Sequence, residues 1–392
     1  MLIFYGVGTI LGLGIYVLLG KIAGEAGMMA PFSFLLAASI AAFTGISYGE
    51  LSARIPKSAG EVNYVDEAFQ QCPLSILMGW LIILSAIVST ATVVNGYVGY
   101  VQVFAPIPDY LIITGIVVLL SAVAVWGIWE SAIMIVVITT LEIIGILLVI
   151  IVAGDNLGQL PARWTEIVPA MRWDDWKMIT LGAFLAFFTF IGFQDLVNVA
   201  EEARNPRKDM PRAIIWSLAI LTFLYLIVAT IAALGLKPQE LNQSKAPLAD
   251  VLAKEGENYP EIISGISLIA IVNGVLVQIV MIARVLYGMA EKRMAPKLFG
   301  RVNRVTQTPV WSTVLSAGVI LILALLFDLE NLAEATNYIL IVVFIAINAA
   351  LWRIKQKDPN PDGIRTYPQA VPVIGDVLSL AVLVFQVVNA IG

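Results

Sequence analysis

The chain has 392 residues, of which 59% are hydrophobic and only 13% are charged, and its net charge is −5. Soluble domains carry about 25% charged residues, so we expect most of this apolar surface to face lipid. The sequence has no histidine and one cysteine, Cys72, which excludes histidine-based acid–base catalysis, Cys/His zinc sites and an internal disulfide. We therefore expect no enzymatic activity, no metal, no cofactor and no nucleic-acid partner.

Eleven segments are apolar over about 20 residues, the length that crosses the hydrocarbon core of a bilayer. They lie near residues 1–22, 31–50, 74–103, 109–128, 131–153, 176–200, 213–235, 260–286, 310–327, 332–352 and 370–391. The first has no charged region before it, and we interpret it as a retained helix and not a cleaved signal peptide. The pattern predicts an all-α polytopic membrane protein with a single transmembrane domain over residues 1–392.

The basic residues predict how the chain is oriented in the membrane. With the N-terminus inside the cell, only seven of the 23 Lys and Arg residues fall outside, and the other 16 are cytoplasmic. The seven are Lys21, Arg163, Arg172, Lys177, Lys237, Lys245 and Lys254. Because cytoplasmic loops of membrane proteins hold the excess of Lys and Arg, we expect a cytoplasmic N-terminus and location in the cytoplasmic membrane.

The first span holds four glycines within nine residues, Gly6, Gly8, Gly12 and Gly14. Each glycine costs about 1 kcal/mol in a helix interior. One interpretation is close packing between helices, since Gly8 and Gly12 form a small-xxx-small pair. The other is a helix interrupted around Gly12, Leu13 and Gly14, whose free amides at the start of the second half favour a carboxylate.

The fifth span places Glu142 near its centre, within an otherwise apolar segment. A charged, unpaired carboxylate at that depth costs several kcal/mol, so the group should be protonated or face a polar cavity. An apolar environment favours the neutral form of a carboxyl group, which suits reversible proton uptake. We predict that Glu142 binds the coupling proton. The alternative is a structural carboxyl group that pairs with a polar group of a neighbouring helix.

The sixth span has a similar irregularity, because Gly192 lies in mid-span and Gln194 and Asp195 follow it. Buried polar groups are costly in lipid and often mark a transport pathway. If spans 1–5 and 6–10 are repeats, the two irregular segments occupy corresponding positions. Inverted repeats with broken helices at matching positions are typical of transporters that bind substrate at the middle of the bilayer. We place the repeats at about 1–153 and 176–352, with an extra helix at about 370–391.

Five segments, in order, resemble signatures of the amino acid–polyamine–organocation (APC) transporter superfamily. They are GTILGLGIYVL at 8–18, SYGELSARIPKSAGE at 47–61, GIWESA at 127–132, FIGF with EEARNP between 190 and 206, and ARVLYGMA at 283–290. The resemblance implies a fold of five plus five inverted-repeat helices, shared with the sodium-coupled leucine transporter. It differs from most members in having eleven expected spans and not twelve.

The resemblance also implies a binding site formed by the two breaks. Gly12 opens the first break, and the amides of Leu13, Gly14 and Ile15 are expected to bind the α-carboxylate of the substrate. Carbonyl groups around Phe188, Thr189 and Phe190, before Gly192, are expected to bind its α-amino group, with Phe188 as an aromatic gate. Gln194 and Asp195 are expected just outside this site. Leu13 and Gln194 depart from the family pattern, since many members have a small residue at the first position and an acidic one at the second.

The resulting expectation is a secondary active transporter that moves an amino acid across the cytoplasmic membrane by alternating access. In the resemblance, Glu142 falls where some members have a lysine proposed to replace a sodium ion. The related sodium site uses hydroxyl groups of the eighth span, where Ser264 and Ser267 lie early and no Ser or Thr follows before Arg284. This favours a proton as the driving ion and leaves sodium open.

The cargo is expected to be neutral, apolar or small, because Asp195 is the one acidic residue beside the breaks. A polyamine or other amine as cargo, amino acid exchange or export, and a non-transporting membrane sensor remain as alternatives. The oligomeric state stays open.

Overall fold

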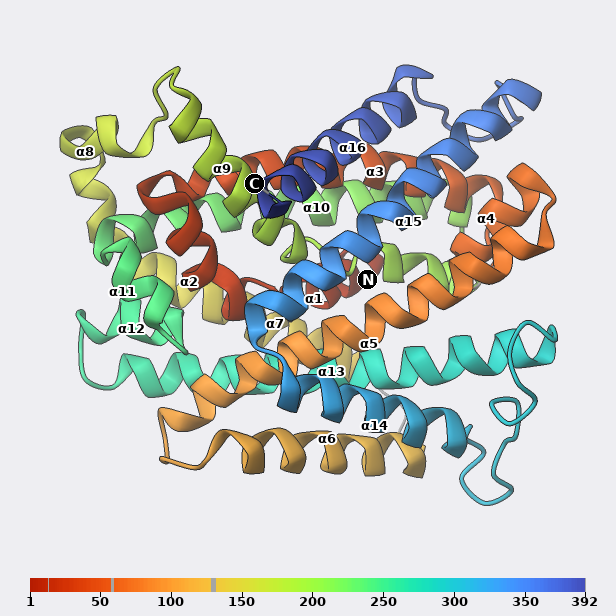
Figure 1. Ribbon diagram of the computed structural model, residues 1–392, viewed down its shortest axis with the longest axis horizontal. Helices are drawn as coiled ribbons and strands as arrows, with labels where there is room; N and C mark the ends of the chain where they lie inside the picture. Colours follow the sequence, from red (N-terminus) through yellow and green to blue (C-terminus); the bar gives the residue numbers. More distant parts are fainter. Residues whose placement is uncertain (13, 58–59, 128–131, 392) are drawn as a thin grey trace.

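The computed structural model describes residues 1–12, 14–57, 60–127 and 132–391 (Figure 1). All regular elements of these residues are helices. Eight helices in the described ranges are long and apolar enough to cross a membrane, or nine if the bent pair Val136–Val152 and Gly154–Ile167 is one span. Two shorter apolar helices, α1 (Leu2–Leu11) and α14 (Val310–Leu326), also coincide with predicted spans. The prediction of an all-α polytopic protein is confirmed.

The helix bounds follow the apolar segments of the sequence. The long helices are α3 (Ala30–Arg54), α5 (Cys72–Gln102), α6 (Asp109–Trp126), α7 (Ala132–Val152), α9 (Trp173–Phe188), α10 (Pro206–Gly235), α13 (Tyr259–Glu291), α15 (Leu329–Lys357) and α16 (Ala370–Ile391). The short ones are α2 (Ile15–Ala26), α4 (Gly60–Phe69), α8 (Leu160–Ile167), α11 (Pro238–Gln243), α12 (Pro247–Ala253) and the 3₁₀ turns η1 (Gly27–Met29), η2 (Gly154–Gln159) and η3 (Phe193–Glu202). Proline stands in the first turn of α3, α5, α10 and α13, where its missing N–H costs nothing.

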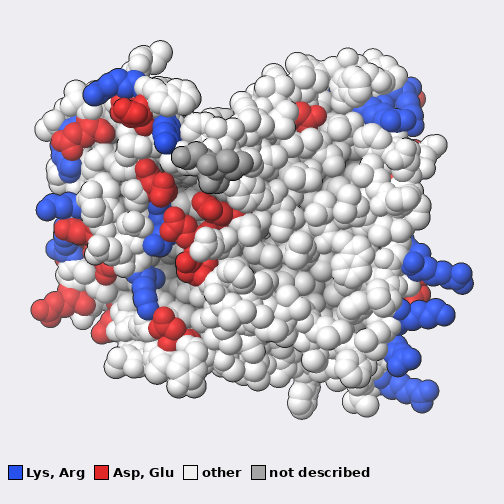
Figure 2. All heavy atoms as spheres, viewed as in Figure 1, with Lys and Arg blue, Asp and Glu red and all other residues white. Residues whose placement is uncertain are grey.

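The outer helices expose apolar side chains over a broad belt. Leu119 of α6, Ile322 of α14 and Val388 of α16 are each more than half exposed. Figure 2 shows a wide, almost uncharged surface between two ends that carry the Lys, Arg, Asp and Glu residues. A soluble protein does not expose so large an apolar surface, so this belt is the part that faces lipid.

The core lies where α3 packs against α9 and α10, and where α5 packs against α13 and α15. Four buried rings occupy the middle of this core. Tyr48 of α3 lies 5.5 Å from Phe193, and Phe344 of α15 lies 5.3 Å from Phe193 and 5.5 Å from Phe187, measured between ring centroids. These edge-on and tilted ring contacts stabilise the sixth span on both sides of its interruption.

The two ends of the helix bundle differ in charge. The end formed by the C-terminal ends of α3, α13 and α15 is the right-hand end in Figures 1 and 2, and we call it the basic end. It carries Arg54, Lys57, Arg293, Lys297, Arg353 and Lys357. The opposite end, with α8, α11 and α12, mixes both signs (Figure 2). The predicted cytoplasmic N-terminus depends on this difference in charge between the two ends. The orientation of the chain in the membrane stays a prediction.

Candidate functional site

The first span is broken where the sequence predicts it. α1 ends at Leu11, and α2 begins at Ile15. Gly12 keeps helical angles (φ −64°, ψ −17°), whereas Gly14 leaves the helical region at φ −123° and ψ −72°. Leu13 lies outside the described residues. The first amides of α2 have no preceding carbonyl of the same helix as partner, so the break presents a helix N-terminus that favours an anion.

The sixth span is broken as well, after Phe188. Residues 189–192 form turns in which the N–H of Phe190 donates to the carbonyl of Phe187, and that of Ile191 to the carbonyl of Phe188. Gly192 then reaches φ +119°, in the left-handed region that favours glycine. The 3₁₀ segment η3 continues the span from Phe193. The carbonyl of Phe188 therefore already has one partner, and an ammonium group there would use its second lone pair.

The two breaks are in direct contact with each other. A Cβ atom added to Gly14 would lie 2.9 Å from the carbonyl oxygen of Thr189, and one added to Gly192 would lie 2.7 Å from that of Thr9. The hydroxyl of Thr9 donates to the carbonyl of Gly6 at 3.1 Å, with a longer 3.4 Å contact to that of Gly192. Glycine is required at both positions because backbone approaches backbone. The fold thus brings the first and sixth spans together at their breaks, although Thr9 and Gly192 are 183 positions apart.

Glu142 lies beside the first break. It is fully buried in α7, and its Oε1 is 3.2 Å from the point where a Cβ of Gly12 would lie, next to the carbonyl of Ala270 at 3.1 Å. The hydroxyl of Tyr16, in α2, donates to the backbone carbonyl of Glu142 at 2.7 Å, and Tyr100 donates to the carbonyl of Tyr16 at 2.6 Å. The sequence places Glu142 at mid-membrane depth, and the structure adds its position against Gly12.

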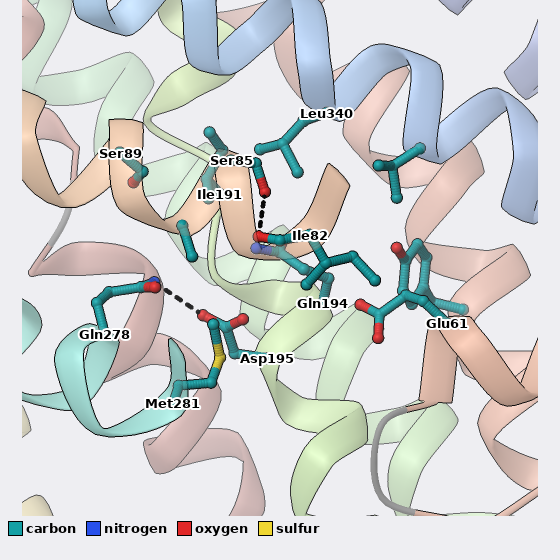
Figure 3. A pocket seen from close by; sticks show the side chains of 13 residues that line it. Glu61, Ile82, Ser85, Ser89, Ile191, Gln194, Asp195, Gln278, Met281 and Leu340 are labelled. Atoms are coloured by element: carbon teal, nitrogen blue, oxygen red, sulfur yellow. Dashed lines mark hydrogen bonds between the residues drawn. The ribbon is translucent and has the colours of Figure 1, made fainter. Parts of the chain in front are cut away.

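A second group of polar side chains lines a small cavity beside the sixth break (Figure 3). Gln194 Oε1 accepts the N–H of Gly192 at 3.0 Å, which stabilises the break itself. Asp195 Oδ2 accepts from Gln278 Nε2 of α13 at 3.2 Å. Glu61, the second residue of α4, points its carboxyl group toward the same space. The sequence analysis expects Gln194 and Asp195 just outside the site. It does not identify Glu61, although this residue stands in the segment 47–61 that resembles the superfamily.

Burial raises the pKa of Glu61, which lies outside the membrane-spanning helices, to about 8. Its own backbone N–H lowers the pKa, and the charge of Asp195 raises it. Burial is the largest of these effects because a carboxylate loses its hydration there. This shift favours the protonated form of Glu61 in this conformation.

The space between these side chains is small. The volume open to the centre of a water molecule is about 20 Å³, which holds a water molecule and not an amino acid. Gly14 also lies against the backbone of Thr189, and we call this conformation, in which the two breaks touch, closed.

Comparison with known proteins identifies the family of the chain. The whole chain, residues 1–392, matches the family model described as "Amino acid permease". The chain belongs to the amino acid permease family. This permease is therefore a multi-pass membrane protein of a family whose members are transporters and not enzymes, and the APC resemblance is confirmed.

Several curated relatives match over most of the permease. It is 29% identical to the branched-chain amino acid permease BcaP of Bacillus subtilis over 98% of this chain and 85% of that protein. It is 28% identical to human cationic amino acid transporter 4 over 90% of this chain, and spans 59% of the length of that protein. It is 29% identical to the methylthioribose transporter of Bacillus subtilis over 91% of this chain. Relatives with nearly the same sequence identity to this chain are thus named for different cargoes.

Proposed function

We propose that this permease is a secondary active transporter that carries a neutral amino acid by alternating access, driven by a proton that Glu142 binds. The observation that carries the proposal is the contact between the two broken spans, with Glu142 against Gly12. The helix N-terminus at Gly14 and Ile15 offers amides for a carboxylate, and turn carbonyls around Thr189 and Phe190 offer acceptors for an ammonium group. When the two breaks separate, a zwitterion would bind to these two sets of backbone groups.

The side chains around the breaks favour an apolar cargo. Phe188, Phe190 and Ile191 are buried beside the sixth break, and the named cargo of the Bacillus permease relative is a branched-chain amino acid. A cationic amino acid or polyamine is the second candidate. It is supported by the carboxyl groups of Asp195 and Glu61, and by relatives named as cationic amino acid transporters.

Glu142 suits proton coupling because its carboxyl group lies where the two half-helices of the first span meet. A movement that separates the breaks changes the surroundings of this group and so its preference for a proton. We place the basic end in the cytoplasm, in line with the excess of Lys and Arg there. The bacterial relative favours the cytoplasmic membrane as the location.

Flux measurements with reconstituted protein test the proposal. Proteoliposomes with an imposed pH gradient should accumulate a labelled branched-chain amino acid, and a set of about twenty amino acids should compete with it in order of apolar character. Glu142→Gln should lose gradient-driven accumulation but keep exchange of labelled for unlabelled substrate. Uptake that needs sodium and ignores pH would refute proton coupling, and binding without flux would identify a sensor.

A further inference from the structure

The cavity beside the sixth break is lined by polar groups from five separate segments. Tyr48 comes from α3, Glu61 from α4, Ser89 from α5, Asp195 from η3 and Gln278 from α13. Figure 3 shows the carboxyl groups of Glu61 and Asp195 and the amide of Gln278 directed toward the same space. Since each comes from a different element, this arrangement is made by the fold and not by one amphipathic helix.

Two of these groups indicate that the cavity holds a polar ligand. Gln278 Oε1 and Ser89 Oγ have no hydrogen-bond partner among the described residues, and both side chains are only 2% exposed. A buried polar atom without a partner costs about 1–3 kcal/mol. The available volume of about 20 Å³ admits one water molecule or a hydrated proton. Such a ligand would supply the missing hydrogen bonds.

The charges around the cavity favour a shared proton. The lining residues include two carboxyl groups and no Lys or Arg, and the titratable groups that act on Glu61 are Asp195 and Tyr48, with Tyr64 of α4 beside Tyr48. Two carboxylates in a dry site cannot both ionise cheaply. The amide N–H of Gln278 donates to Asp195 Oδ2 at 3.2 Å, whereas burial raises the pKa of Glu61, and we therefore place the proton on Glu61.

We propose that Glu61 and Asp195 form a second proton-binding site of this permease, which holds one proton in the closed conformation and releases it at the basic end when the cavity opens. The proposal rests on the proposed transport function, and it adds a proton station distinct from Glu142. Glu61 suits release because it stands at the N-terminus of α4, close in sequence to the exposed Lys57 at the basic end.

Infrared difference spectroscopy of the purified full chain tests the site without any transport. Wild-type protein should show the carbonyl band of a protonated carboxyl group that disappears as pH rises through about 8. Glu61→Gln should lack this band, whereas Glu67→Gln, an exposed carboxyl of the same helix, should keep it. An unchanged band in Glu61→Gln would overturn the proposal.

A second variant keeps the test valid if Glu61→Gln does not fold. The charge of Asp195 raises the pKa of Glu61, so Asp195→Asn should move the midpoint of the same band to lower pH. A midpoint that does not move would refute the coupling between the two groups. Loss of the band at constant pH on addition of sodium chloride, but not of N-methylglucamine chloride, would show an alkali-cation site and overturn the proton assignment.

Transport then separates this inference from the proposed function. In proteoliposomes, Glu61→Gln should lower the number of protons that enter per substrate by about half, from two to the one that Glu142 carries, while substrate exchange at equal pH continues. Coupling that is intact in Glu61→Gln and lost in Glu142→Gln would refute the second site alone. A wild-type protein that shows the infrared band but no transport would refute the proposed function alone.

Discussion

Replacing Glu50 with Gln is expected to destabilise the fold strongly, because this carboxylate holds a buried ion cluster at the basic end. Glu50 of α3 accepts from Lys355 Nζ of α15 at 2.7 and 2.9 Å, from Arg54 Nη2 at 2.7 Å, and from the N–H of Tyr367 at 3.0 Å. The side chains of Glu50 and Lys355 are 0% and 3% exposed. Lys355 also donates to the carbonyl of Tyr367, which fixes the loop before α16.

The expected magnitude follows from the burial of the pair. Removing one partner of a buried ion pair costs about 3–5 kcal/mol, because the other charge stays buried without its counter-charge. Glu50→Gln should therefore lower the free energy of unfolding by that amount. Lys355→Met should cost less, since Glu50 keeps Arg54. Adding Lys355→Met to Glu50→Gln should recover part of the loss, because it removes the uncompensated ammonium group.

Unfolding of the purified protein in detergent, followed for both single variants and the double variant, measures the coupling between Glu50 and Lys355. We expect a coupling free energy of about 2 kcal/mol, within the range for residues of one ionic network. Glu67→Gln, on the exposed side of α4, is the control and should behave as wild type. A loss below about 1 kcal/mol in Glu50→Gln, the size expected of an exposed pair, together with additive single variants, would refute the reasoning.

Three further predictions concern the breaks and the cavity. Gly14→Ala should lower the free energy of unfolding by about 1–3 kcal/mol, the usual cost of overpacking, and should abolish uptake. The control Gly115→Ala, whose added methyl group meets no atom within 4 Å, should change neither. Equal uptake by both variants would show that glycine is not required at position 14. Tyr100→Phe should cost about 1 kcal/mol, since it removes the buried hydrogen bond to Tyr16, and calorimetry that finds no change would contradict this. Glu61 binds its proton more tightly when folded, with a pKa of about 8 against the ordinary 4.5. Its contribution to stability is therefore complete below about pH 4.5 and declines as pH rises through about 8, so the fall in melting temperature over this range should be smaller in Glu61→Gln than in wild type.

The membrane-spanning helices were predictable because the pattern that specifies them is local. An apolar run of about 20 residues has few alternatives in lipid, and each predicted span coincides with described helices. The breaks were predictable for a similar reason, since Gly12 and Gly14 weaken a helix wherever they stand, and Gln194 after Gly192 marks a polar point in an apolar run.

The contacts between distant residues were not predictable from a single sequence. Glu50 and Lys355 are 305 positions apart, and each alone resembles an ordinary charged residue at a helix end. Glu61 and Asp195 line the same cavity only because of how α4 packs in the fold. The local sequence pattern of α4 does not distinguish the buried Glu61 from the exposed Glu67. Such pairings depend on how the helices pack, which periodicity and composition do not encode.

The reciprocal fit of the two glycines has a consequence for motion. Thr189 occupies the place of a side chain at position 14, and the backbone of Thr9 occupies that place at position 192. Neither broken span can therefore tilt outward by itself without losing both contacts at once. In the proposed transport cycle, a cargo that separates the two spans would therefore break both contacts in the same step.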